Sequence, residues 1–513
     1  MSWKKELEDL AVREAFADKM GGAEKVARQK SRGKLTARER IAALLDPNSF
    51  REIGKTAGRG VYGEDGALQD LQASNFIFGR GLIDGAAVVA SADDFTVRGG
   101  ASDAAIHRKF VFAEQMAHEL RMPLIRMIDG TGGGGSVKSL EAMGFTYVPF
   151  VPGWEHVVRN LETVPVVSLA LGPCAGLGAA RVVASHYSVI VRGIGQVFTA
   201  GPKVAQAIGD GERENDALGG ADIHARNGVV DDEAASEAEA FAMARRFLSY
   251  LPPYAGAEHT RRPAADPAGR REESLLSLVP RDPRQAYNMR RALEAVCDRG
   301  SVFEIGRHWG RGVITALARL DGWPVAVLAN DPTFLGGSTT ADGAQKQKRF
   351  VELAELFRLP VVHFVDNPGF MIGLEAEKAA TIRRGVEAMN AVYRSSVPWA
   401  TVIVRKAYGV AGAAMSDHTR FQYRFAWPSG DWGSLPMAGG VEVAYKSELE
   451  AADDPQAALQ AINARLAGLT SPFRTAEQFL IEDIIDPRET RPLLCEFTAL
   501  AQRGADGVAR TQK

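Results

Sequence analysis

Runs of apolar residues alternate with amphipathic stretches along most of the chain. The runs are rich in Val, Ile, Leu and Ala and have the length of buried strands. They occupy residues 81–92, 164–171, 361–365 and 397–404. Phe110–Leu120 and Phe350–Phe357 instead have apolar residues at helical spacing, and each ends just before a Pro-containing strand. Alternating strands and helices predict an α/β fold.

The pattern repeats once, at nearly constant spacing. The matched pairs are Asp94–Gly100 with Asp331–Gly337, Arg121–Asp129 with Arg358–Asp366, and Cys174–Ala180 with Tyr408–Ala414. The offset is 237 residues for the first two pairs (331 − 94 and 366 − 129) and 234 for the third (408 − 174). No single match is specific, but three in the same order indicate two related halves.

Chain length agrees with more than one domain. A chain of 513 residues is too long for a single hydrophobic core. The segment between the halves, about Pro252–Arg271, is rich in Pro, Ala, Gly and charge, as exposed connectors are. We therefore predict an N-terminal domain at residues 1–258 and a C-terminal domain at residues 270–505.

Composition and charge restrict the class of protein. The formal net charge is −2, so no global field favours nucleic acid or an anionic membrane. No apolar stretch reaches membrane-spanning length, and the charged N-terminus has no apolar signal core. The three cysteines lie far apart, which predicts neither a disulfide framework nor a metal site. We expect a cytoplasmic protein that binds neither nucleic acid nor membrane.

Two turns rich in Gly and Ala are the strongest chemical feature. Gly172–Ala180 and Arg405–Ala414 each follow a predicted strand and lead into a predicted helix. Small residues at such a turn let backbone N–H groups reach a ligand, and a helix dipole favours negative charge there. This arrangement suits an oxyanion hole, and two of them suggest two carbonyl groups polarised at once. Small residues also permit tight helix packing, which would explain one turn alone; the repeated pair favours function.

A glycine run, Asp129–Ser136, includes Gly132, Gly133 and Gly134. It lacks the spacing of a P-loop, because Lys138 does not directly follow the last glycine, and it lacks a GxGxxG fingerprint. The run therefore does not indicate a nucleotide loop. Two interpretations stay open, namely a glycine-lined wall beside a thioester or cofactor ring and a flexible turn.

Cations gather around one glycine at residues 28–40. Thr36, followed three residues later by Glu39, predicts a capping box at a helix start. In this interpretation Arg32 and Lys34 stay free to grip the phosphates of a CoA-like anion. The sequence has no GxSxG elbow or HExxH motif, so we expect catalysis to rest on backbone donors and on a cofactor's chemistry.

Several motifs, in the same order, resemble the carboxyltransferase (β) subunits of acyl-CoA carboxylases, typified by propionyl-CoA carboxylase. They are Arg32–Arg40, Gly172–Gly176, Leu218–Ala221 with His224, Asp366–Phe370, Ile382–Gly385, Arg405–Gly409, Ala426–Pro428 and Asp486–Arg491. The resemblance extends from about Gly21 to about Arg491, almost the whole chain.

The resemblance implies an architecture. Each half would be a crotonase-like domain, and the subunits would form a hexamer. The site would lie between the N-terminal half of one subunit and the C-terminal half of another. Acyl-CoA would bind mainly to the N-terminal half. Carboxybiotin, carried by a biotin carboxylase or biotin carboxyl carrier partner, would bind mainly to the C-terminal half.

The resemblance also assigns site residues. Backbone N–H groups of Gly176 and Leu177 would hold the thioester enolate, and those of Val410 and Ala411 would hold the ureido oxygen of biotin. The residues on the acyl-CoA side would be Arg32, Lys34, Gly132, Gly133 and Gly134. Those on the biotin side would be Asp366, Gly369, Phe370, Tyr408 and Gly409. No metal is implied in this subunit.

Departures from the family's pattern leave the acyl group open. Leu177 and Val410 stand where the family commonly has glycine. Ala413 stands where an acidic residue influences acyl choice in short-chain members. We expect carboxylation at the α-carbon, or the vinylogous γ-carbon, of an acyl-CoA, and a bulkier acyl group than propionyl agrees with these changes.

Three other functions compete with this one. A biotin-dependent acyl-CoA decarboxylase uses the same site in the reverse direction, and sequence alone separates the two poorly. A crotonase-type hydratase or isomerase without biotin would need carboxylates in the turn after Gly176, and Ala179, Ala180 and Arg181 offer none. A non-catalytic scaffold for the partner subunit would tolerate bulky changes at Gly176 and Ala411.

Overall fold

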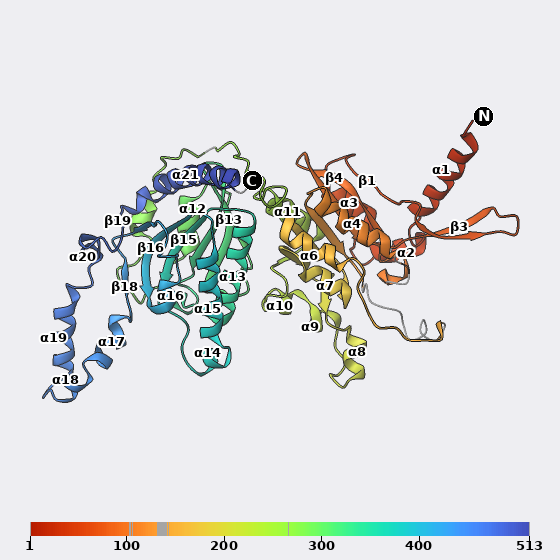
Figure 1. Ribbon diagram of the computed structural model, residues 1–513. Coiled ribbons are helices and arrows are strands. Elements are labelled where there is room, and N and C mark those ends of the chain that lie inside the picture. Colours follow the sequence, from red (N-terminus) through yellow and green to blue (C-terminus); the bar gives the residue numbers. More distant parts are fainter. Residues whose placement is uncertain are drawn as a thin grey trace. The chain divides into compact units, whose positions relative to one another are not determined.

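Two large β-sheets, one in each half of the chain, organise the computed structural model (Figure 1). The structure describes residues 2–511 except 102, 103, 105, 131–140, 142 and 265. Contacts divide the chain into unit 1, Met1–Ala257, and unit 2, Glu258–Lys513. Each unit has its own buried apolar clusters around its own sheet.

The sheet of unit 1 is antiparallel at one side and parallel through its centre. Across the sheet the order is β1 (Arg51–Glu52), β4 (Phe76–Ile83), β5 (Ala86–Asp93), β6 (Leu124–Ile128), β7 (Val166–Ala170), β9 (Tyr187–Val191) and β11 (Asp232–Ala234). Strands β1, β4 and β5 pair antiparallel, and the pairs from β5 to β11 are parallel. Every residue of β6 and β7 is buried, as expected for central parallel strands.

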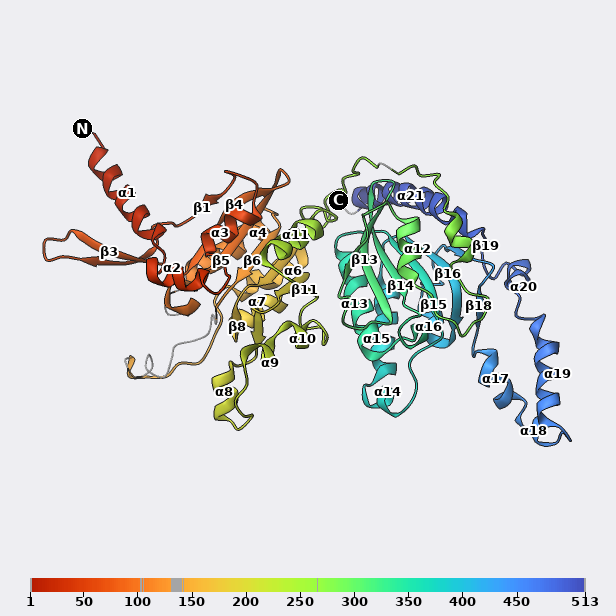
Figure 2. The same ribbon diagram turned by 180° about the vertical axis from the view of Figure 1, so that it is seen from behind.

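Unit 2 repeats this order and these directions. Its sheet runs β12 (Phe303–Ile305), β13 (Val313–Leu320), β14 (Trp323–Asn330), β15 (Val361–Asn367), β16 (Trp399–Tyr408), β17 (Tyr423–Ala426) and β19 (Asp483–Ile484). The first three strands pair antiparallel, and the pairs from β14 to β19 are parallel. The mixed α/β class predicted from the sequence is confirmed, and Figure 2 shows the unit 2 sheet from behind.

One predicted strand was wrong. Residues 81–92 form a β-hairpin, in which β4 turns into β5 at Asp84 and Gly85. Both turn residues have positive φ, 50° and 79°, as a tight two-residue hairpin requires. The apolar run continues on both sides of the turn, which concealed it. Unit 2 has the same turn at Asp321 and Gly322, with φ of 50° and 79°.

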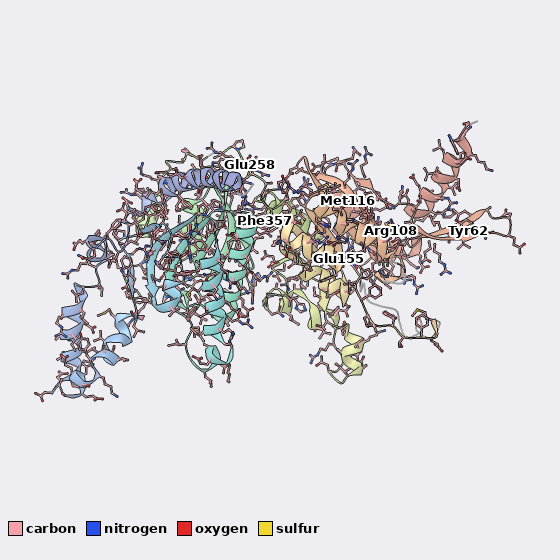
Figure 3. All side chains as sticks on the ribbon, viewed as in Figure 1. Tyr62, Arg108, Met116, Glu155, Glu258 and Phe357 are labelled. Atoms are coloured by element: carbon pink, nitrogen blue, oxygen red, sulfur yellow. The ribbon has the colours of Figure 1, made fainter. Side chains whose placement is uncertain are left out.

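Each unit combines helices that pack on its sheet with helices that project away from it (Figure 1). In unit 1 they are α1 (Lys4–Asp18), α2 (Ala23–Lys30), α3 (Ala37–Leu44), α4 (His107–Glu119), α6 (Trp154–Thr163), α7 (Leu177–Val183), α8 (Pro202–Ala207), α9 (Asn215–Gly219), α10 (Ala221–His224) and α11 (Glu237–Leu248). The hairpin of β2 (Gly58–Tyr62) and β3 (Leu68–Ala73) projects from unit 1 with Tyr62 at its far part (Figure 3). Thr36 and Glu39 bond each other's backbone N–H at the start of α3, which confirms the predicted capping box.

In unit 2, α13 and α15 pack together and α21 lies along the sheet (Figure 1). The helices are α12 (Met289–Val296), α13 (Ala341–Leu356), α14 (Leu374–Lys378), α15 (Thr381–Arg394), α16 (Gly409–Ala413), α17 (Met437–Ala444), α18 (Lys446–Glu450), α19 (Pro455–Ala467), α20 (Pro472–Glu477) and α21 (Thr490–Thr511). Among the helices that the structure describes, none is long and apolar enough to cross a membrane.

Strand register fixes how the two units correspond. Ile128 of β6 pairs with Ala170 of β7, and Val365 of β15 pairs with Ile403 of β16. The offset is therefore 237 residues at the first strand of each pair (365 − 128) and 233 at the second (403 − 170). The offset of 234 predicted for the turn that follows was wrong, because matching glycine letters shifted the alignment by one residue against the hydrogen-bond ladder.

The ends of these strands agree with the register. β8 (Pro173–Ala175) pairs in parallel with β10 (Gln196–Phe198), as the last residues of β16 pair with β18 (Asp431–Gly433). A glycine of positive φ follows in each unit, Gly176 at 58° and Gly409 at 61°. Gly176 therefore corresponds to Gly409, and the next residues correspond in turn.

Candidate active site

The turn of unit 1 lies where β7 ends and α7 begins. Gly176 caps α7 with φ 58° and ψ −119°, a conformation that favours glycine, and its backbone is exposed. Its N–H donates to Phe198 O at 3.3 Å. Leu177 is the first residue of α7, so its N–H has no acceptor one turn earlier within the helix. Within the predicted pair, Leu177 is the better placed donor for a ligand.

The turn of unit 2 has the same form but a more exposed side chain. Val410, which corresponds to Leu177, is 52% exposed, whereas Ala411 is buried. Ala413 is exposed on the same short helix. Before the turn, the buried Tyr408 donates its hydroxyl hydrogen to Asp431 Oδ1 at 2.6 Å. Burial, and then Asp431, raises the pKa of Tyr408, so this phenol stays neutral.

Asp366 is the next-to-last residue of β15 and has no exposed surface. Its carboxylate accepts from Arg405 Nε at 3.0 Å and from the backbone N–H of Lys406 at 3.0 Å. Burial raises the pKa of Asp366, and the Arg405 guanidinium opposes that shift. The carboxylate therefore holds the start of the turn and does not face a ligand.

Gly369 and Phe370 continue the chain beyond Asp366. Gly369 has φ 126°, and its carbonyl accepts from the N–H of Thr339 at 3.0 Å. Phe370 packs its ring on Gly385 of α15, where an added Cβ would lie 2.3 Å from the ring carbon Cζ. The structure thus brings Tyr408 and Gly409 to the turn, and it places Phe370 against the neighbouring helix.

Asp129 is the corresponding acid of unit 1, and it is also fully buried. Lys34 Nζ lies 2.8 Å from its Oδ1 and 2.6 Å from its Oδ2, and Arg40 Nη1 donates to Oδ2 at 2.7 Å. The prediction that Lys34 stays free was therefore wrong: its side chain is 8% exposed and paired. Burial lowers the pKa of Lys34, and the charge of Asp129 opposes that shift.

A cavity of about 210 Å³ opens beside Lys34 in unit 1. Its lining is Lys25, Arg28, Gln29, Arg32, Lys34, Phe95, Thr96, Arg98 and Gly99. Arg32 is exposed there, as predicted for a phosphate grip. Sequence reasoning missed Lys25 and Arg98. Arg98 carried a signal, because the repeat puts the uncharged Leu335 at its equivalent position in unit 2 (335 − 98 = 237).

The glycine run stands apart from these observations. Gly132, Gly133 and Gly134 lie outside the described residues. Gly130, just before them, touches the backbone of Gly100, whose Cβ position would lie 2.7 Å from Gly130 Cα. Across the described part of the chain, no group of three or more His, Cys, Asp or Glu side chains is placed to hold a metal ion.

Comparison with known proteins decides the family. The family described as carboxyl transferase domain matches residues 28–512. The chain belongs to this family. The predicted resemblance is thereby confirmed, and with it the assignment of the chain as a carboxyltransferase subunit of the acyl-CoA carboxylase type.

Three relatives illustrate the range of the carboxyl transferase family. The chain is 32% identical over 501 residues to the carboxyltransferase subunit of propionyl-CoA carboxylase from Haloferax mediterranei, covering 96% of this chain and 95% of the relative. It is 30% identical to the α subunit of methylmalonyl-CoA decarboxylase from Veillonella parvula, covering 94% and 92%. A crystal structure of the hexameric transcarboxylase 12S with methylmalonyl-CoA bound matches with a TM-score of 0.86 at 28% identity, covering 98% of this chain and 95% of that one.

Proposed function

We propose that this subunit transfers a carboxyl group from carboxybiotin on a partner protein to the α-carbon, or the vinylogous γ-carbon, of an acyl-CoA. Unit 1 is the acyl-CoA side and unit 2 the carboxybiotin side. Both are crotonase-like domains related by an internal repeat, in a subunit that assembles as a hexamer. One observation carries the proposal: the same glycine turn ends a central parallel strand in both units, and a cation-lined cavity accompanies it in unit 1.

The acyl-CoA side needs two properties that unit 1 has. Lys25, Arg28, Arg32 and Arg98 line one cavity, and guanidinium and ammonium groups are the usual partners of phosphate oxygens. The N–H of Leu177 then serves as the donor to the thioester oxygen, where negative charge develops when the α-proton leaves. The turn carries no carboxylate that would repel an enolate.

The carboxybiotin side fits the residues of unit 2. Asp366 is shielded by Arg405, and Asp431 accepts the hydroxyl hydrogen of Tyr408, so neither presents a bare charge to the exposed turn. The backbone N–H groups of Val410 and Ala411 are proposed to hold the ureido oxygen. Carboxybiotin, when bound, supplies the carboxyl group. The chain's own residues orient the ring and stabilise the charge left on it.

The acyl group is proposed to be larger than propionyl. Ala413 is small, uncharged and exposed, so the turn of unit 2 places no carboxylate at this position. The named substrates of the relatives, propionyl-CoA and methylmalonyl-CoA, belong to those proteins. We favour carboxylation, and the Veillonella relative makes decarboxylation the alternative that an experiment must separate.

Incorporation of radiolabelled bicarbonate tests the proposal. The subunit is assembled with its biotin-carrying partner and assayed against a panel of acyl-CoA thioesters of increasing size. Acid-stable label in one or more products is the expected result. Release of CO2 from carboxylated thioesters without incorporation would favour the decarboxylase, and inactivity toward the whole panel would overturn the assignment.

Proline variants test the donors. Leu177→Pro removes one N–H at the first position of α7, where proline is tolerated. Because one oxyanion donor commonly contributes a factor of about 10²–10³ to kcat, we expect a loss of that size, and Leu177→Ala should keep turnover. Val410→Pro and Ala411→Pro separate the two donors proposed in unit 2. Their controls are Val410→Ala and Ala411→Gly. Unchanged turnover in all three proline variants would refute the assignment of these backbone N–H groups as oxyanion donors.

A further inference from the structure

The two units hold their buried aspartates differently. In unit 2, Asp366 is held by Arg405 Nε and by the N–H of Lys406. The register places Gly172 and Pro173 at these two positions in unit 1 (405 − 172 = 233). Glycine brings no cation and proline brings no N–H. Unit 1 has therefore lost both local partners of its aspartate and must supply others.

The Asp129–Lys34 ion pair occupies the space that Gly172 leaves. A Cβ on Gly172 would lie 1.8 Å from Asp129 Oδ1 and 2.7 Å from Lys34 Nζ, so a side chain there is incompatible with the ion pair. Lys34 reaches Asp129 from 95 positions earlier in the chain. The missing side chain at residue 172 is thus a requirement for a cation delivered from the N-terminal segment.

Arg40 ties the same network to the turn. Its Nη1 donates to Asp129 at 2.7 Å, its Nη2 to Leu171 O at 2.9 Å, and its Nε to Glu237 at 2.6 Å. Glu237 in turn accepts from the N–H of Leu35, beside Lys34, at 2.8 Å. All four charged side chains are less than 9% exposed. Lys34 is therefore linked through Asp129 and Arg40 to residues 171 and 172, which lead into the turn.

Lys34 also faces the cation-lined cavity. Among the cavity's cations in the described part of the chain, Lys34 is the one that bonds Asp129. An anion in the cavity competes with Asp129 for the three N–H donors of the Lys34 ammonium. Binding and turn geometry are then linked through one side chain, because the ligand interacts differently with two arrangements of it.

We propose that Lys34 is a positioning residue that couples occupation of this cavity by the phosphates of CoA to the geometry of the Leu171–Leu177 turn. The inference rests on the proposed function for the chemical role of that turn. In unit 2 the cation that holds Asp366 is instead Arg405, which lies on strand β16 itself. Occupation of the cavity thus adjusts the proposed donor at Leu177 before the thioester reacts.

Hydrogen exchange tests the coupling without turnover. Adenosine 3′,5′-bisphosphate carries nucleotide phosphates of CoA but has no thioester arm to touch the turn. At saturation, judged by calorimetry, it is expected to change the rate of amide exchange in peptides covering residues 171–183 of the full chain. Lys34→Met is expected to bind the bisphosphate more weakly and, when saturated, to show no such change. Arg32→Met, a matched cavity cation without the Asp129 bond, should lose affinity and keep the change in exchange.

Kinetics give a second readout. An acyl-pantetheine should turn over with a kcat about 5- to 150-fold below that of the same acyl-CoA, the usual range of coupling between sites. Added bisphosphate should recover part of that loss in wild-type protein and none in Lys34→Met. The charge-conserving Lys34→Arg should recover part of the response. Arg32→Met should act mainly on KM.

Several outcomes would overturn the inference. They are failure of the bisphosphate to bind, binding that leaves exchange at residues 171–183 unchanged, and a Lys34→Met response equal to that of wild type. If Lys34→Met does not fold, the exchange responses of the wild-type protein and of Lys34→Arg to the bisphosphate test the coupling. Absence of carboxylation with every acyl-CoA would refute the proposed function, whereas the exchange result would still judge the coupling.

Discussion

Asp129 and Asp366 end corresponding strands of the two units, yet the cations that hold them come from different parts of the chain. Arg405 reaches Asp366 from 39 positions away, on the adjacent strand β16. Lys34 and Arg40 reach Asp129 from 95 and 89 positions away. The cation that holds the turn of unit 2 lies on its own sheet and also bonds Gln285 O. The cations that hold the turn of unit 1 come from the N-terminal segment, which also lines a cavity.

Under the proposed function, this difference would let one fold serve two kinds of ligand. A turn fixed within the sheet is a rigid platform, suited to a group that always arrives on the same carrier. A turn held through a distant segment responds to whatever that segment binds. On this proposal, Asp366 stabilises a fixed site in unit 2, whereas Asp129 stabilises a site in unit 1 that depends on its ligand. Three changes test this contrast, in decreasing order of expected effect.

Arg40→Leu should produce the largest effect. It leaves Asp129 and Glu237 buried with one cation between them, and breaking such a pair costs about 3–5 kcal/mol. Arg405→Leu should cost toward the lower end of that range, because the N–H of Lys406 still bonds Asp366. Urea unfolding, followed by hydrogen exchange in peptides from each unit, measures both losses and assigns them to their units.

A matched control is available in unit 1. Arg108 is exposed on α4 (Figure 3), and Arg108→Leu should change stability by no more than about 0.5 kcal/mol. The proposed difference between the units would be contradicted if Arg40→Leu destabilised unit 1 no more than this control. It would also be contradicted if Arg405→Leu destabilised unit 2 more than Arg40→Leu destabilises unit 1.

Acid should affect the two units alike. Burial lowers the pKa of His186 in unit 1 and of His363 in unit 2 to about 4. Both are neutral when folded, and each takes a proton at about 6.5 when unfolded. The unfolded chain therefore binds more protons between pH 6.5 and 4, and stability falls as pH falls through this window. Each histidine should account for a loss on the order of 3 kcal/mol.

Exchange measured at several pH values checks the symmetry. Above about pH 6.5, His186 and His363 should cause no further change in the free energy of unfolding. His186→Gln should flatten the pH dependence of unit 1 alone, and His363→Gln that of unit 2 alone. A flat profile in wild type, or a change in the wrong unit, would contradict the shared burial of these rings.

The sequence predicted features with local signals. The capping box at Thr36 follows from residue types three positions apart, and the buried strands follow from apolar runs. The family follows from motifs spread over the chain. Two of the three corrected features need more than residue types. The hairpin at Asp84 lies within one apolar run, and the one-residue shift at Gly176 is visible only in strand pairing.

The pairing of Lys34 could not be predicted for a different reason. A lysine in a basic segment is usually solvated, and nothing within that segment marks one of its cations as buried. The signal lies 138 positions later (172 − 34), in Gly172 and Pro173, and it has meaning only beside Arg405 and Lys406 of unit 2. This signal depends on the offset of 233, because an offset of 234 would pair Gly172 with Lys406 instead of Arg405.

The smallest expected effect concerns the hairpin turns, which correspond at Asp84 and Asp321. Arg245 donates to Asp84 and Asp46 at 2.8 Å each, and to Leu44 O at 2.9 Å. Arg261 bonds Asp321 alone, through its carboxylate at 2.5 Å and its carbonyl at 2.8 Å. Both arginines are partly exposed, so each pair is worth about 0.2–1 kcal/mol.

Arg245→Ala should lie near the top of that range and Arg261→Ala near the bottom, since a second carboxylate, that of Asp46, loses a partner only in unit 1. Exchange at the turn amides of residues 84, 85, 321 and 322 reports each loss locally. At 1 M salt the difference should shrink, because the Debye length falls to about 3 Å. Equal losses that do not respond to salt would mean that the extra carboxylate partner of Arg245 adds nothing to the turn of unit 1, and that the bonds from the turn amides to Asp46 and Asp298 hold both turns alike.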